Sequence, residues 1–98
     1  MRVLEGVLSE SQGYYLGIKK KIELKIRNLP KGSIKERRIS GRRYYYLQFR
    51  QGKKVIQKYL GKIKPEAIIK QIKYRSLLKS ELKKVNQALK VIKRSRRQ

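Results

Sequence analysis

Apolar side chains recur every three or four residues at both ends of the chain, which is the spacing of one helical face. The N-terminal stripe has eight positions, two of them polar: Leu4, Leu8, Ser11, Tyr15, Ile18, Ile22, Lys25 and Leu29. Gly13 and Gly17 weaken a helix interior, so the spacing predicts a helix most clearly from Ile18 to Asn28. Pro30 then ends this helical arm, residues 1–29, because proline disfavours helix at the residue before it.

A longer stripe with the same spacing predicts a C-terminal helix over residues 65–93. Its positions are Ile68, Ile72, Arg75, Leu78, Leu82, Val85, Leu89 and Ile92. Pro65 suits the first helical turn, and Glu66 complements the positive end of the helix dipole. Residues 94–98 are interpreted as a frayed basic tail. Two stripes of similar length predict that the helices pair antiparallel, as in a coiled-coil hairpin.

Between the stripes, residues 33–60 read as a three-stranded antiparallel meander. The strand-length runs are Ser33–Ile39, Tyr44–Arg50 and Lys54–Leu60. Short turns separate them, with Gly41 in the first and Gly52 in the second to permit positive φ. The predicted fold is therefore α+β, with a helix, a three-stranded meander and a long second helix in a single domain of residues 1–98. A lone sheet of this size needs a helical cover on its apolar face.

Alternation along the strands assigns their side chains to two faces. One face is predicted to be the core, with two lysines at its edge: Ile34, Tyr45, Leu47, Phe49, Ile56 and Leu60, with Lys54 and Lys58. The other face mixes cations, amides and phenols: Lys35, Arg37, Ile39, Tyr44, Tyr46, Gln48, Arg50, Val55, Gln57 and Tyr59. Centring the second turn on Gln51-Gly52 or on Gly52-Lys53 gives the same assignment, since paired residue numbers sum to an odd value either way.

Charge changes the interpretation of the second face. The 98 residues include 29 Lys and Arg but only 6 acidic residues, all Glu, so the formal net charge is +23. Self-repulsion at this density opposes a compact state, and a polyanion would relieve it. Nucleic acid is therefore the leading partner class. The competing interpretation is a solvated basic surface without a specific ligand, although such surfaces usually mix both signs of charge.

Missing residue types narrow the functional classes. The sequence has no Cys and no His, so it offers no disulfide, zinc finger or imidazole base. It also has no Asp, and its glutamates are scattered, so the carboxylate sets of magnesium-dependent nucleases are missing. We therefore expect no enzymatic activity, no metal and no cofactor. Neither a membrane-span run nor a signal-peptide pattern occurs, so we expect a cytoplasmic protein, nucleoid-associated if it binds DNA, with no membrane partner.

The mixed face and its turns form the candidate nucleic-acid-binding site. Arg and Lys can neutralise phosphates or contact guanine, Gln can pair with adenine, and Tyr can reach a phosphate or stack on an unpaired base. The opposing interpretation is that tyrosines simply favour strands and stabilise sheets as cross-strand pairs. The predicted contact residues are Lys35, Arg37, Arg42, Arg43, Tyr44, Tyr46, Gln48, Arg50, Lys53, Gln57 and Tyr59.

The sheet segment resembles two groups of proteins over roughly residues 31–62. The motifs are Gly32-Ser33-Ile34, the run GRRYYYLQFR from Gly41 to Arg50, Gly52-Lys53-Lys54-Val55, and KYLGK from Lys58 to Lys62. They resemble a family of small bacterial and archaeal proteins of unknown function, with this sheet between helical arms, and the N-terminal sheet module of some insertion-sequence transposases. A more distant similarity is to the three-stranded arm-type DNA-binding domain of tyrosine integrases, whose sheet enters the major groove. Several relatives carry cysteines around the module, and this chain has none, so no metal-supported version is implied.

Three functions remain open at this point. The first is a DNA-binding regulatory or mobile-element or phage accessory protein that reads duplex DNA, which the two glutamines and the integrase-like layout favour. The second is an RNA-binding protein whose exposed tyrosines stack on unpaired bases. The third is a protein-interaction module, such as an antitoxin or inhibitor, whose basic surface occupies a site on a toxin or nuclease. In each case the chain would act as a monomer or as a homodimer through its helices.

Overall fold

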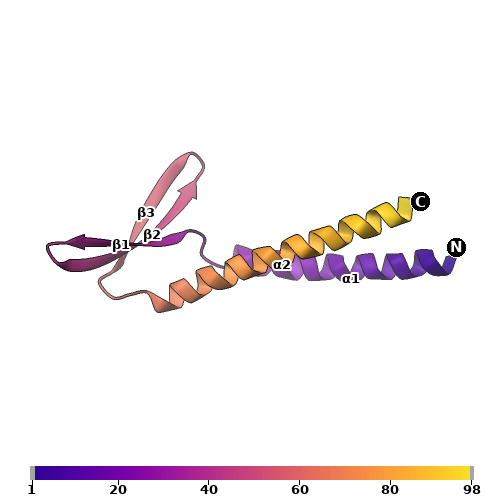
Figure 1. Ribbon diagram of the computed structural model, residues 1–98, viewed down its shortest axis with the longest axis horizontal. Coiled ribbons are helices and arrows are strands. Elements are labelled where there is room, and N and C mark those ends of the chain that lie inside the picture. The colour runs from indigo at the N-terminus through magenta and orange to yellow at the C-terminus, as the bar shows by residue number, and fades with distance from the viewer. Residues whose placement is uncertain (1, 98) are drawn as a thin grey trace. The chain divides into compact units, whose positions relative to one another are not determined.

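A computed structural model describes residues 2–97 of the chain (Figure 1). The elements in order are α1 (Arg2–Arg27), β1 (Ser33–Ile39), β2 (Arg42–Gln51), β3 (Lys54–Gly61) and α2 (Glu66–Arg97). The fold is α+β, with an N-terminal helix, an antiparallel sheet in the order β1-β2-β3 and a long C-terminal helix, as the sequence predicted. Met1 and Gln98, and the side chains of residues 2–4 and Arg97, lie outside the described part, so the predicted stripe position at Leu4 falls there too.

The chain divides into two compact units. The helical unit is Met1–Asn28 with Ser76–Gln98, and the sheet unit is Leu29–Arg75, which holds the three strands and the first turns of α2. The prediction of a single domain stays a prediction. Within the described part of the chain, neither helix is long and apolar enough to cross a membrane.

In the helical unit, α1 and α2 lie side by side and antiparallel (Figure 1). The buried side chains come from the two predicted stripes: Ile22, Leu78, Val85 and Ile92, each at most 9% exposed. At one end of the pair, the Arg96 guanidinium donates a hydrogen bond to Gln12 Oε1. The hairpin predicted from the two stripes is therefore confirmed.

α2 runs further than the sequence predicted, and α1 is helical through most of the predicted arm. α1 continues from Arg2 to Arg27 through Gly6, Gly13 and Gly17, and Ile26 packs inward where Lys25 was expected, which keeps the lysine ammonium in water. α2 continues to Arg97 instead of ending at residue 93 before a frayed tail. Within these last turns, Ser95 Oγ donates a hydrogen bond to the Val91 carbonyl oxygen at 3.0 Å.

Two-residue turns set the register of the sheet. The first turn is Ser40-Gly41, and both residues have the positive φ of a type I′ turn, 54° and 79°. The second turn is Gly52-Lys53, with Gly52 at a φ of 63°, the pattern of a type II′ turn. Of the two placements that the sequence allowed for this turn, the later one is therefore correct.

The chain enters β1 through a glycine that no other residue can replace without strain. Gly32 has a φ of 118°, and a Cβ added there would overlap the carbonyl oxygen of Gln48 on the neighbouring strand. Only glycine combines this backbone conformation with so close an approach. The close contact brings the start of β1 against β2.

The register places the sheet side chains on the two predicted faces. Tyr45, on the apolar face, is 7% exposed and belongs to the core. Tyr46, the next residue, is paired with Lys35 on β1 and with Tyr59 on β3, all on the opposite face. A bulge lies between these two positions of β2, so that Leu60 is an extra residue on β3. The register is unbroken from Gln51–Lys54 to Tyr46–Tyr59, so the bulge does not change the face on which these residues lie.

The first turns of α2 cover the apolar side of the sheet only in part. Ile69 and Ile72 of α2 line, together with Ile34 and Tyr45 of the sheet, a hollow of about 380 Å³. The remaining apolar side chains of that face are half-buried: Leu47, Phe49, Ile56 and Leu60. The helical cover that the sequence required is therefore present, but it leaves the sheet core loosely closed.

Candidate nucleic-acid interface

The mixed face of the sheet, defined as the face of β1, β2 and β3 that carries Tyr46, brings together all but two of the predicted contact residues. They are Lys35, Arg37, Arg42, Tyr44, Tyr46, Gln48, Arg50, Gln57 and Tyr59. Arg43 points to the opposite face, where its Nε lies 3.2 Å from Glu36 Oε1. Lys53 lies in the turn between β2 and β3. The sequence analysis assigned Glu36 to neither face and so missed this ion pair, although strand alternation puts Glu36 on the same face as Ile34.

Arg37 crosses the mixed face from one edge strand to the other. It starts on β1, and its Nη2 donates a hydrogen bond of 2.6 Å to Gln57 Oε1 on β3. On the way, its guanidinium carbon lies 5.2 Å from the centroid of the Tyr46 ring on β2, within cation–π range. The guanidinium group therefore contacts an aromatic ring with its face and an amide oxygen with one of its N–H groups.

Gln57 extends this contact into a relay with a defined direction. Its Nε2 donates to Gln48 Oε1 at 3.0 Å. Arginine has only donors, so Gln57 must turn its oxygen towards Arg37 and hence its nitrogen towards Gln48. Both amide oxygens of the relay thus accept a hydrogen bond from within the protein. Each of these oxygens keeps one lone pair, whereas both N–H groups of Gln48 Nε2, the second N–H of Gln57 Nε2 and the remaining N–H groups of Arg37 are unused, so donors outnumber acceptor sites on the relay.

This polarity decides which ligand groups the relay fits. A donor surface complements acceptors such as phosphate oxygens and the N7 and O6 atoms of guanine. A bidentate contact to adenine needs the free oxygen and the free nitrogen of one glutamine. In Gln57 both amide groups already make one bond within the relay, and in Gln48 the oxygen does, so each amide oxygen has a single acceptor site left. The relay therefore suits guanine or phosphate better than adenine.

The three tyrosines of the mixed face form one cluster. The ring centroids of Tyr46 and Tyr59 are 5.4 Å apart, and those of Tyr44 and Tyr59 are 6.3 Å apart. Tyr44 and Tyr46 are half-buried, whereas Tyr59 is 51% exposed. Cross-strand packing thus accounts for most of this aromatic surface. Tyr59 is the ring most open to a ligand.

Positive charge around the mixed face is not neutralised on that face. The sheet unit, residues 29–75, has 15 Lys and Arg and 2 Glu, a net charge of +13. The only acidic residue of the strands, Glu36, is held by Arg43 on the opposite face. The basic side chains of the mixed face are all exposed: Lys35, Arg37, Arg42 and Arg50. The face therefore combines a hydrogen-bonded relay rich in donors with exposed cations.

Comparison with known proteins identifies a family and no function. The family model described as Domain of unknown function (DUF6788) matches residues 15–84, which is well over half of the chain and includes the whole sheet. No curated protein and no solved structure matches the chain. The predicted resemblance to small proteins of unknown function is confirmed at this level. The comparisons give no support to the resemblance to transposase or integrase modules.

Proposed function

We propose, for a chain that belongs to the family described as Domain of unknown function (DUF6788), that the mixed face of its sheet binds duplex DNA. The observation that carries this proposal is the direction of the Arg37–Gln57–Gln48 relay, in which unused N–H donors outnumber unused acceptor sites. Duplex DNA offers acceptors along both phosphate backbones and, at guanine, in the major groove. A regulatory or mobile-element accessory role is the biological setting that fits such binding.

In this proposal, some residues of the mixed face contact phosphates and others contact base edges. Lys35, Arg42 and Arg50 surround the relay and would neutralise phosphates, which supplies affinity without reading sequence. Arg37 and Gln48 would contact base edges, since their donors are held in place by bonds within the sheet. Holding these side chains before binding reduces the rotamer entropy lost on binding.

The arrangement of the tyrosines favours a duplex over a single strand. Binding of single strands relies on open aromatic rings on which successive bases stack. Arg37 lies over the Tyr46 ring, and Tyr59 packs beside it, so that among the three tyrosines of the mixed face only Tyr59 offers a largely open ring. RNA is the competing ligand class, and it would have to use Tyr59, because the deep major groove of an RNA helix is closed to side chains.

The test is competitive binding of duplex DNA, single-stranded DNA and structured RNA at several salt concentrations. Arg42→Ala and Arg43→Ala form a matched pair, because the two arginines are adjacent but lie on opposite faces. Arg42→Ala should weaken duplex binding and flatten the log–log salt slope by about 0.9, the value for one phosphate contact on B-DNA. Arg43→Ala should leave the slope near that of the parent.

Three results would contradict the proposal. Equal losses for the two arginine variants would mean that the mixed face has no special role. Affinity that does not change with salt would exclude phosphate contacts. Tighter binding of structured RNA or single strands than of the duplex, lost on Tyr59→Ala, would establish the competing ligand class instead.

A further inference from the structure

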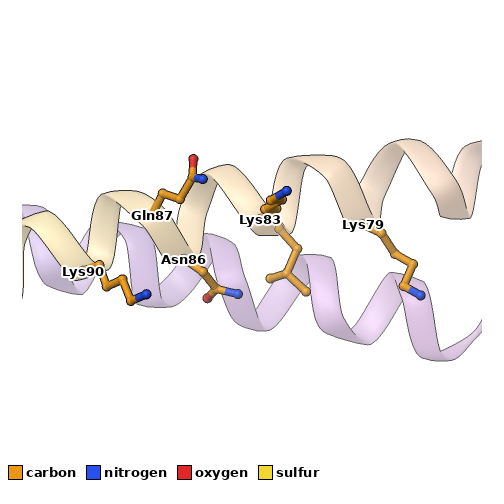
Figure 2. Close-up of a pocket in the computed structure, with 6 residues that line it drawn as sticks. Lys79, Lys83, Asn86, Gln87 and Lys90 are labelled. Carbon is orange, nitrogen blue, oxygen red and sulfur yellow. The ribbon is translucent and has the colours of Figure 1, made fainter.

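A groove along α2 carries positive charge that the mixed face does not use. It encloses about 410 Å³ in the helical unit, and its polar lining residues are labelled in Figure 2. The lining residues are Lys79, Leu82, Lys83, Asn86, Gln87 and Lys90. At about 100° per residue, the three lysines fall within an arc of roughly 40° on one side of the helix. The sequence carried this signal in the spacing of the lysines, which are four and seven residues apart.

The polar residues that line this α2 lysine groove are all lysines and amides, with no acidic residue among them. Its lysines and amides are exposed, and Leu82 is half-buried. Glu81 is the only acidic residue of Ser76–Gln98. It lies two positions from both Lys79 and Lys83, which places it on about the opposite side of α2. The groove thus offers ammonium and amide donors with no carboxylate among its lining residues.

The net charge of the helical unit also favours an anionic ligand on that unit, in addition to one on the sheet. The helical unit has 14 Lys and Arg and 4 Glu, a net charge of +10, beside the +13 of the sheet unit. A polyanion bound only to the mixed face would leave the self-repulsion within the helical unit in place. The groove concentrates three of these charges on one side of one helix.

We propose that the α2 lysine groove is a second binding surface, which takes the sugar–phosphate backbone of nucleic acid. This inference rests on the proposed function, namely that the chain binds nucleic acid. Lysine binds phosphate as a point charge, and Asn and Gln are among the side chains that contact phosphate and sugar. The mixed face would read the duplex, and the groove would add affinity that does not depend on base sequence.

Two other occupants fit the groove less well. An anionic membrane surface needs an apolar face beside the lysines, whereas the only apolar lining residue, Leu82, is half-buried. A second copy of the chain would bring another net charge of +23 against the same lysines. Charge complementarity therefore selects a polyanion with regularly spaced phosphates.

The experiment measures the salt dependence of duplex DNA binding by the full chain and its variants. Lys83→Gln and Lys84→Gln are the matched pair, because they remove equal charge at adjacent exposed positions and only Lys83 lines the groove. Lys83→Gln should flatten the log–log slope by about 0.9, and the triple variant at Lys79, Lys83 and Lys90 by about 2.7. Lys84→Gln should keep the parent slope.

A sheet variant, Arg37→Ala with Arg42→Ala, separates the two proposals. If this variant loses affinity while the triple lysine variant keeps the parent slope, the groove proposal is overturned and the sheet proposal stands. If only the triple variant loses affinity, the groove proposal holds and the sheet proposal fails. Equal salt slopes of duplex binding for Lys83→Gln and Lys84→Gln would overturn the groove proposal. No binding of duplex DNA by the parent would overturn both. Lysine-dependent binding to phosphatidylserine vesicles, with an unchanged duplex slope, would show that the groove serves a membrane instead.

Discussion

Tyr45 and Tyr46 are neighbours in the sequence, and replacing each with alanine should have opposite consequences. Tyr45 is 7% exposed in the core of the sheet unit. Burial of a tyrosine removes roughly 150–250 Å² from water, which at about 25 cal/mol per Å² amounts to roughly 4–6 kcal/mol as an upper bound. Because the residue borders a hollow of about 380 Å³, part of its surface lacks packing partners. We therefore expect Tyr45→Ala to lower the free energy of unfolding by about 3–4 kcal/mol.

Tyr46→Ala removes less from the folded state. The ring is half-buried, and its main contacts are the Arg37 guanidinium at 5.2 Å and the Tyr59 ring at 5.4 Å. A cation–π contact and a cross-strand aromatic pair each contribute about 0.5–1 kcal/mol. The expected loss is thus about 1–2 kcal/mol, roughly half of that at Tyr45. Binding should nevertheless weaken, because Arg37 loses the ring that holds its side chain in place.

Urea unfolding followed by circular dichroism gives the two stabilities, and duplex binding is measured where each variant is folded. Tyr45→Ala should bind in proportion to its folded fraction, whereas Tyr46→Ala should bind more weakly while folded. If Tyr46 stacks on unpaired bases, its loss should cost about 1–3 kcal/mol on single strands and clearly less on a duplex. A folded Tyr45→Ala protein that fails to bind, beside a Tyr46→Ala protein that binds normally, would refute the assignment of the two faces to core and ligand.

Two further predictions concern the helical pair and the relay. Leu78 is 4% exposed and Leu82 is half-buried, so urea unfolding should show a loss of about 2–5 kcal/mol for Leu78→Ala and a smaller loss for Leu82→Ala. Lys84→Ala should be near neutral, and equal losses for all three would contradict the packing of α2. Gln48→Glu keeps an acceptor for Gln57 but replaces the outward donor with a carboxylate, so binding to guanine-rich duplexes should fall more than binding to adenine-rich ones. An equal fall would show that the relay does not contact bases.

Local periodicity was sufficient to predict the elements and the faces of the sheet. A helical stripe depends on neighbours three and four residues away, so the inward positions of α2 were found without any knowledge of the partner helix. Successive strand side chains alternate, so Tyr45 and Tyr46 had to lie on opposite faces whichever turn placement was correct. The sequence also carried the net charge of +23, on which the proposal of a nucleic-acid ligand rests.

The extent of the helices depended on tertiary packing. Gly13 and Gly17 made the part of α1 before Ile18 a poor helix by propensity, yet it is helical where it pairs with α2. The last turns of α2 read as a frayed basic tail, yet Arg96 bonds to Gln12 of α1. Contacts with a partner helix contribute more than propensity differences of about 1 kcal/mol per glycine.

The chemistry of the mixed face was also decided in three dimensions. Alternation placed Arg37, Gln48 and Gln57 on one face, but it could not show that a side chain from β1 crosses β2 to bond with β3, 20 residues further along the chain. Arg43 was grouped with the contact residues because it flanks a turn of the sheet, whereas the structure pairs it with Glu36 on the other face. Strand parity is a property of the backbone, whereas the direction of a hydrogen-bond relay depends on which side chains reach one another and which of them can only donate.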